Sequence, residues 1–425
     1  MKAENIEDAI AFFDPHLPLH RGSEFYVGRE RNPRLEVKSF LLRAGRAVKI
    51  LFTGFKGSGK STELNYLAGD EEIEEKFLLI NFSVKKILNL TSIDYIDLLF
   101  VMAEQIYDTA VSIPGVEIDK NSLELLKRWG QKVETEEKFS SKADVEAKTW
   151  ISSFFASVTA RLKMGYSKDT TLKQELKPRM TELWNRLNDI IRDVRVQTGK
   201  NLLIIIDDLN KADIDVAEEL FYIYGHNLTI PKCHILFTIP ISLVYSENFP
   251  NIERNFDKTW ILPGFKIYER ESQERCEHNF EKMKEIIRLR MDVDKLTDEP
   301  NEIMNILVHY SGGFVRELII LTQNALNKAA AFGERKICIA DVDEAVHDAK
   351  NTFINTTYIR ENIEYLLSVE ETKTIVTKDE EITRKLLHNL SILQYKNCEN
   401  WFDVNPLLKD FIHEVSAEEK DIEKP

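Results

Sequence analysis

The chain has 425 residues, of which 43% are hydrophobic and 30% charged, and its formal net charge is −14. This length exceeds the size at which one hydrophobic core usually stops growing, so two or three domains are expected, and the composition excludes a disordered chain. The acidic excess argues against a surface that binds nucleic acid by general electrostatics, which requires clustered Lys and Arg.

The sequence gives no reason to expect disulfides, a zinc site or a membrane partner. Its start, MKAENIEDAI, is acidic and lacks the regions of a signal peptide, and its longest aliphatic run, LLIII at 202–206, is too short to span a bilayer. There is no CxxC and no His at ligand spacing, so reduced thiols are expected at Cys233, Cys276, Cys338 and Cys398. We therefore expect a cytoplasmic protein.

In chain order, residues 1–48 form a lead-in region, with a Gly-Arg turn at Gly28 and Arg29 followed by a helix. Residues 49–265 then read as strands that alternate with helices. The apolar, β-prone runs that predict strands lie within 48–53, 77–84, 201–210, 233–240 and 257–265. Because these runs are continuously apolar, they predict a parallel sheet covered by helices on both faces.

Residues 111–200 interrupt this alternation with amphipathic helices, which predicts a helical insertion in the sheet domain. Lys and Arg outnumber Asp and Glu across 120–200, although the chain as a whole is acidic. Two interpretations stay open: ordinary solvated helices packed on the core, or a docking surface for a partner or nucleic acid.

The remaining third of the chain predicts two smaller units. Residues 266–350 are almost wholly helical and suit a helical bundle, joined to the sheet by the turn at Pro263 and Gly264. Residues 351–425 hold a helix at 380–391 and then two short aromatic-rich strands around the turn KNCEN, an order typical of a winged helix. The acidic tail EVSAEEKDIEKP is expected to be frayed.

The clearest chemical signal is the match to G-x-x-x-x-G-K-[ST] between the first strand and the helix after it. In such a loop, backbone N–H groups and the helix N-terminus bind phosphate oxygens, the lysine reaches the β- and γ-phosphates, and the hydroxyl binds Mg²⁺. The alternative is a plain helix-capping loop. The residues predicted to bind the nucleotide here are Gly54, Lys56, Gly57, Ser58, Gly59, Lys60, Ser61 and Thr62.

Two acids, Asp207 and Asp208, end the run LLIII. Carboxylates at this edge of a parallel sheet are costly to bury unless a cation pairs with them, and ligands bind at this edge. We predict that Asp207 holds Mg²⁺, together with Ser61, and that Asp208 orients or deprotonates the attacking water. The alternative for Asp208 is that it only caps the next helix.

Three further residues are candidates for contact with the γ-phosphate or the water. Thr238 ends the next apolar strand, and a threonine that simply ends a strand is nearly as good an interpretation. Arg316 opens a helix after a double glycine and could reach the phosphates, or lie on the surface. Arg254 precedes the fifth strand and could act across a subunit boundary, although an ordinary surface role is favoured.

With these landmarks in order, the chain resembles the AAA+ superfamily, and within it the initiator-like and STAND branch of signalling ATPases. The resemblance rests on YVGRE, the phosphate loop (Walker A), IIIDD (Walker B), the strand ending at Thr238 (sensor 1) and GGFVREL (sensor 2). It covers roughly residues 20–350 without the insertion, and the C-terminal hairpin is similar to the winged helix that follows the lid. It implies ATP and Mg²⁺ as cofactors, with Gly28 and Arg29 on the adenine side and 266–350 as a lid.

Two departures from the family pattern matter. Typical members that act as motors carry Asp-Glu at Walker B, whereas this chain has Asp207-Asp208, and the shorter side chain predicts slow hydrolysis. The usual Arg-finger motif is also absent, which leaves Arg254 as a candidate only.

The leading functional hypothesis is an ATP-dependent switch that controls a partner or effector protein and can form a homo-oligomer. In bacteria, proteins resembling this branch often serve in defence systems. The alternative is a DNA-dependent ATPase of initiator or transposition-regulator type. Residues 351–425 disfavour it, because they carry 9 Lys and Arg against 15 Asp and Glu and a DNA-reading winged helix is normally basic. A scaffold that binds ATP only for stability is a third possibility.

Overall fold

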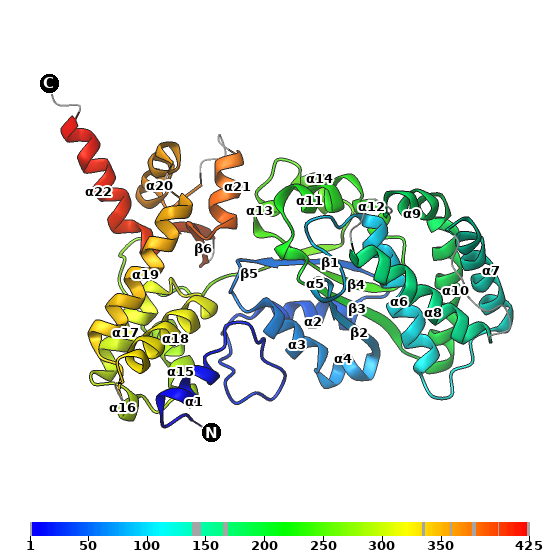
Figure 1. The fold of residues 1–425 in the computed structure, drawn as a ribbon, viewed down its shortest axis with the longest axis horizontal. Helices are drawn as coiled ribbons and strands as arrows, with labels where there is room; N and C mark the ends of the chain where they lie inside the picture. Colours follow the sequence, from blue (N-terminus) through cyan, green and yellow to red (C-terminus); the bar gives the residue numbers. More distant parts are fainter. Residues whose placement is uncertain are drawn as a thin grey trace.

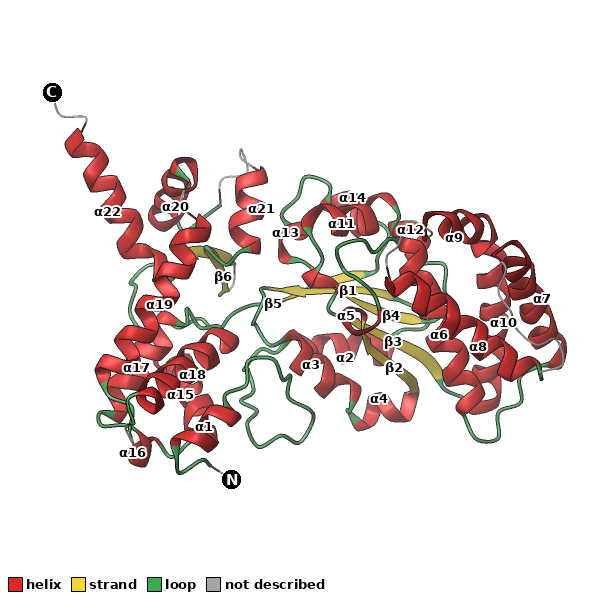
Figure 2. Cartoon of the chain, viewed as in Figure 1, coloured by secondary structure: helices red, strands yellow, loops and turns green. Residues whose placement is uncertain are grey.

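The computed structural model describes residues 2–137, 146–164, 169–333, 336–357, 359–375, 380–397 and 399–422. At its centre is a five-stranded sheet in the order β2-β3-β4-β1-β5, in which all neighbouring strands are parallel (Figure 1; Figure 2). The predicted strands are all present, as β1 (Lys49–Gly54), β2 (Phe77–Ser83), β3 (Asn201–Asp207), β4 (His234–Ile239) and β5 (Lys258–Leu262).

Both faces of the sheet are buried. Alternate residues of each strand point to opposite faces, so one strand contributes to two apolar clusters. In β3, Ile204 and Ile206 belong to one apolar cluster and Leu203 and Ile205 to another. The second cluster includes the helices on one face, α2 (Pro33–Arg43), α3 (Lys60–Ala68) and α4 (Glu71–Lys76). This double burial explains the unbroken apolar runs and confirms the predicted fold class, an α/β parallel sheet with a P-loop and helices on both faces.

The other face is covered by the long helix α6 (Tyr95–Ser112) and by short helices (Figure 1). The short helices are α5 (Val84–Ile87), the 3-10 turn η2 (Leu209–Lys211), α11 (Ile214–Glu218), the π-helix η3 (Glu219–Ile223), α12 (Gly225–Leu228), α13 (Ile241–Val244) and α14 (Phe249–Glu253).

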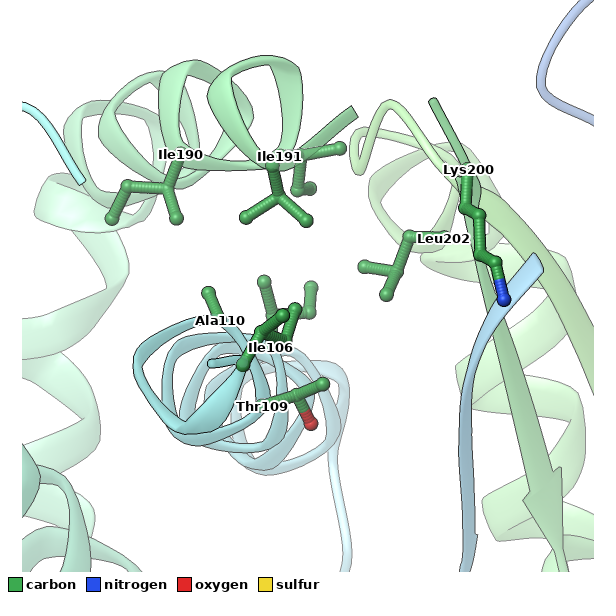
Figure 3. A pocket seen from close by; sticks show the side chains of 9 residues that line it. Ile106, Thr109, Ala110, Ile190, Ile191, Lys200 and Leu202 are labelled. Carbon is green, nitrogen blue, oxygen red and sulfur yellow. The ribbon is translucent and has the colours of Figure 1, made fainter. Parts of the chain in front are cut away.

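The predicted insertion is helical and packs against α6 at one edge of the sheet. Its elements are α7 (Lys120–Glu137), α8 (Ala147–Met164), α9 (Asp169–Leu176), the 3-10 turn η1 (Lys177–Arg179) and α10 (Met180–Thr198). Figure 3 shows Ile106 and Ala110 of α6 facing Ile190 and Ile191 of α10, beside Leu202 of β3. The space between them is about 10 Å³, roughly the room of one water. The apolar faces of these helices therefore pack on the core, whereas a docking role for their outer surface stays a prediction.

A helical unit follows the sheet and has its own apolar core. It contains α15 (Glu277–Arg290), α16 (Val293–Leu296), α17 (Pro300–Tyr310), α18 (Val315–Ala331) and α19 (Ile339–Thr357). The N-terminal helix α1 (Ile6–Phe12) packs in this same core, although the sequence groups it with the lead-in region. The unit is fixed to the end of β5 at Gly313, whose φ is +77° and where an added Cβ would lie 1.9 Å from the Phe265 carbonyl oxygen.

The C-terminal unit contains more helix than predicted. Besides α21 (Glu380–His388) and the antiparallel hairpin of β6 (Ile392–Lys396) and β7 (Asn400–Val404), it has α20 (Arg360–Thr372) and α22 (Pro406–Ile422). The acidic tail from residue 414 continues α22 as far as Ile422, beyond the buried Leu408 and Ile412, and its fraying stays a prediction.

Two features expected from the composition can be compared with the structure. Cys233, Cys276 and Cys338 are free thiols, and Cys398 lies outside the described residues. Within the ranges that the structure describes, no helix is both long and apolar enough to cross a membrane.

Candidate functional site

A cavity of about 920 Å³ opens at the carboxyl end of the sheet, where β1, β2 and β3 end. Parallel sheets bind ligands at this edge. Its walls come from the N-terminal segment, the phosphate loop, the end of β3 and the helical unit. The predicted site residues that line it are Arg29, Lys56, Gly57, Ser58, Gly59, Lys60, Ser61, Thr62, Asp207, Asp208 and Arg316.

Lys60 is the first residue of α3 and lies almost completely buried at the base of the cavity. Its ammonium group donates hydrogen bonds to the carbonyl oxygens of Gly54 (2.7 Å) and Phe55 (2.8 Å). Burial lowers the pKa of Lys60 to about 7, and the nearby Asp207 opposes this effect. A phosphate group would supply the negative charge that favours the ammonium form.

The next residue, Ser61, lies beside the carboxylate of Asp207. Burial raises the pKa of Asp207, and the Ser61 hydroxyl opposes that shift. A hydroxyl and a carboxylate side by side are hard oxygen donors, as Mg²⁺ requires when nucleotide phosphates and waters complete its shell. No group of three or more His, Cys, Asp or Glu side chains that could hold a metal occurs in the described ranges. The pair fits a Mg²⁺ ion whose other ligands are phosphate oxygens and waters.

Asp208 follows in a left-handed conformation, with a φ of 72°. This region is sparsely populated for residues other than glycine, and such residues cluster at functional sites. Its carboxylate accepts a hydrogen bond from the Ser83 hydroxyl at the end of β2 and pairs with the Lys211 ammonium group, both at 2.5 Å. Although burial alone would raise it, the pKa of Asp208 is lowered by these two contacts.

Arg316 brings the helical unit to the phosphate loop. It lies in the first turn of α18, its backbone N–H donates to the Gly57 carbonyl (3.2 Å), and its guanidinium lies 3.3 Å from His16 Nδ1. The contact is close: a Cβ on Gly57, whose φ is +82°, would lie 2.7 Å from the Cβ of Arg316. The loop and α18 thus touch at the mouth of the cavity.

Arg29 is half-buried and connects the loop to the linker. Its guanidinium donates to the carbonyl oxygens of Ser58 and Pro263, and lies over the ring of Phe265 at 4.1 Å. Burial lowers the pKa of Arg29 to about 10. The preceding Gly28 does not line the cavity, and its carbonyl accepts a hydrogen bond from Lys282 of α15.

The remaining predicted residues do not line the cavity. Gly54 ends β1 directly below it. Thr238 is buried in β4, and its hydroxyl donates to the Ile206 carbonyl of β3 at 3.2 Å. Arg254 follows α14 on the surface, with its guanidinium 3.3 Å from the Asn251 side chain. The structure does not bring Thr238 or Arg254 into the cavity, and their roles stay predictions.

Sequence reasoning missed the wall formed by residues 14–19. This segment is fixed to α3, since Leu19 N–H donates to Thr62 and the Leu19 carbonyl accepts from Asn65 (both 3.1 Å). The only local signal was the proline-rich run DPHLP. It also missed Ser83, Lys211 and the buried carboxylate of Glu63, which accepts hydrogen bonds from Tyr26, Asn32 and Arg34.

The C-terminal unit also reaches the phosphate loop. Lys56 Nζ lies 2.8 Å from His388 Nε2, at the end of α21. Burial lowers the pKa of Lys56, and burial likewise lowers that of His388. The C-terminal unit also contacts α11 beside the sheet, through the ion pair of Arg384 in α21 with Glu218 at 2.8 Å. The loop is therefore in contact with both units that follow the sheet.

No protein-family model matches the chain, and no curated protein matches its sequence. Among solved structures, it is similar to Cdc6p from Pyrobaculum aerophilum at 12% identity and a TM-score of 0.43, over 96% of this chain and 98% of that one. It is similar to the ORC2 protein of Aeropyrum pernix at 12% identity and 0.41, over 96% and 98%. For the RuvB Holliday junction branch migration motor of Thermotoga maritima the values are 11%, 0.35, 91% and 95%. Similarity of this extent transfers no function to this chain.

Proposed function

We propose that the chain is an ATP-binding, slowly ATP-hydrolysing molecular switch that controls a partner or effector protein. The observation that carries this proposal is the composition of the cavity wall. The phosphate loop, the acids that end β3 and Arg316 of the helical unit all line one space of about 920 Å³. A nucleotide there would contact the sheet and the helical unit at once.

Each part of a nucleoside triphosphate has a counterpart in this wall. The loop N–H groups and the start of α3 would bind the phosphates, with Lys60 and Arg316 as their cations. Ser61 and Asp207 would hold Mg²⁺, which supplies charge neutralisation of the phosphates when bound. Prolines and apolar side chains of residues 14–19, with Ile286 and Ile319 of the helical unit, offer an apolar region for the base.

Slow turnover follows from the contacts that the Asp208 carboxylate makes. As general base, it would accept a proton from the attacking water. Its carboxylate is held by Ser83 and paired with Lys211. A carboxylate with a lowered pKa is a weaker base, and the short Asp side chain reaches less far than Glu.

A switch requires an arrangement of units that differs in its affinity for ATP and its products. Arg316 connects the cavity to the helical unit, and Lys56 connects the loop to His388 of the C-terminal unit. Loss of the γ-phosphate would therefore change the contacts of both units together, which a partner protein could detect.

Several finer assignments rest on the resemblance of the motifs alone. They are membership of the AAA+ superfamily and its STAND-like branch, a lid at 266–350, a winged helix at 351–425, a homo-oligomer and a role in bacterial defence. We keep the domain division at residues 48, 265 and 350 as part of the same proposal.

Two variants test the site. We expect Lys60→Ala to abolish ATP binding in titration calorimetry, because the buried ammonium group is the central phosphate contact. We expect Asp208→Asn to keep the affinity for ATP but to lower the hydrolysis rate about a hundredfold or more, because general-base catalysis typically contributes about 10²- to 10⁴-fold. Arg254→Ala is the control. Because Arg254 lies on the surface outside the cavity, this variant should leave the affinity for ATP unchanged, even if Arg254 acts across a subunit boundary. Parental turnover in Asp208→Asn would refute the base assignment.

Double-stranded DNA added to the same assay tests the alternative of a DNA-dependent ATPase. Stimulation of hydrolysis that disappears at high salt would favour that alternative over the switch. Bound ATP with no turnover under any condition would favour a scaffold.

A further inference from the structure

Lys211 is a cation of the cavity that neither the phosphate loop nor the helical unit provides. It ends the 3-10 turn η2, which directly follows β3, and it lines the cavity. Its ammonium group lies 2.5 Å from the carboxylate of Asp208, and the side chains of the two residues are 37% and 12% exposed.

The backbone fixes this pair. Asp208 is left-handed and its carbonyl accepts a hydrogen bond from the Lys211 N–H at 3.0 Å, which closes the turn over three residues. The turn also packs against β4. The turn therefore holds Asp208 and Lys211 next to each other, and their side chains meet.

Lys211 is also close to the position of the phosphates. It lines the cavity together with Lys56, Lys60 and Arg316. The groups that face the Asp208 carboxylate are Lys211 of η2, Ser83 of β2, Lys85 of α5, Lys60 of α3 and its neighbour Asp207. Lys211 is the cation among them that makes direct contact.

We propose that Lys211 is a positioning residue that restrains Asp208, so that the ion pair keeps basal ATP hydrolysis slow. In hydrolysis, the oxygen of water bonds to the γ-phosphorus, the bond to the ADP oxygen breaks, and one proton of the water passes to the Asp208 carboxylate. An Asp208 oxygen that is held 2.5 Å from the Lys211 ammonium group is turned towards η2 and is not available to the water. This inference rests on the proposed function, in which Asp208 is the base.

The test compares three variants of the full chain in steady-state ATP hydrolysis. Lys211→Met keeps the length of the side chain but removes its charge, and we expect kcat to rise roughly three- to tenfold with little change in KM. Lys211→Arg keeps the charge and should keep the parental rate. Lys258→Met, an exposed lysine on β5, is the matched control and should behave as the parent.

The opposite role for Lys211 makes the opposite prediction. If it binds the γ-phosphate, Lys211→Met would lower kcat or raise KM, and either result would overturn the proposal, as would an unchanged kcat. Lys211→Gln, with a neutral polar side chain, must show the same increase if Lys211→Met folds poorly. Failure of the proposed function looks different: the parent would not bind ATP, or Asp208→Asn would hydrolyse it at the parental rate.

Discussion

Two neighbouring acids show how strongly the pKa of a carboxyl group depends on its surroundings. Asp207 and Asp208 are adjacent in sequence, yet burial raises the pKa of the first, whereas contacts with Lys211 and Ser83 lower the pKa of the second against the effect of burial. Pairs of titratable groups pushed apart in this way are typical of active sites. The division of labour we propose, one acid for the metal and one for water, has this asymmetry as its physical basis.

A buried histidine on the same sheet gives a pH dependence of stability. His234 in β4 is 3% exposed, and burial, with the nearby cations Lys49, Lys76 and Arg195, lowers its pKa to about 4. Protonation then favours the unfolded chain, so stability is lost as pH falls from about 6.5 towards 4. We expect the free energy of unfolding to fall by about 2 kcal/mol more between pH 7 and pH 5 in the parent than in His234→Gln.

Urea denaturation at the two pH values measures this difference. His226 on α12 is exposed, so His226→Gln is the control, and its stability should change with pH as that of the parent does. An equal pH dependence for the parent and His234→Gln would contradict the assignment of a neutral buried ring.

At the scale of elements, the close approach of the phosphate loop to the first turn of α18 couples the nucleotide site to the helical unit. Gly57 allows this approach because it has a positive φ and no side chain. Any side chain at this position would meet Arg316 and push α18 away from the loop.

We therefore expect Gly57→Ala to lower the stability of the protein by about 1–3 kcal/mol, the usual cost of a strained backbone position, and to weaken ATP binding. Gly45→Ala is the control, because an added Cβ there meets nothing within 4 Å. Thermal denaturation and ATP titration of both variants test the contact. A Gly57→Ala protein with parental stability and affinity would show that the loop and α18 are not in close contact in solution.

At the scale of the whole molecule, the C-terminal unit shares an apolar core with the rest of the chain. Phe55 of the phosphate loop and Phe314 before α18 belong to the same cluster as Tyr395 and Trp401 of the hairpin. The Tyr395 hydroxyl also donates to the Gly312 carbonyl at 2.7 Å. The unit is thus fixed at the point where the other two meet.

The ion pair of Arg384 with Glu218 holds α21 against the segment that follows the acids of β3. Its side chains are 14% and 22% exposed, so removal of one partner leaves the other poorly solvated. We expect Arg384→Met to increase hydrogen exchange in α21 and the hairpin several-fold while ATP affinity is retained. Arg360→Met, at an exposed position of α20, is the control, and equal exchange in both variants would contradict a docking role for the pair.

The sequence predicted the strands of the sheet and the cavity wall formed by the phosphate loop and the acids of β3, but not the rest of the wall, and the reason is physical. Strands buried on both faces leave a continuous apolar run such as LLIII, and a phosphate loop needs its glycines and lysine within eight positions. By contrast, the roles of Lys211 and Ser83 can be inferred only from their distances to Asp208, which the sequence does not contain. The position of the wall at residues 14–19 depends on the packing of α1 against α18. Helix α20 was missed although its buried positions Ile363, Leu366 and Val369 repeat at helical spacing.

The place of α1 has a mechanical consequence for the release of nucleotide. The chain crosses between the sheet and the helical unit twice, once after Phe265 and once at residues 14–19, which are bonded to α3 while α1 is embedded in the helical core. Because the chain connects the two units at two places, they cannot separate about a single hinge. Release of a nucleotide from the cavity between them therefore requires a motion that both connections allow.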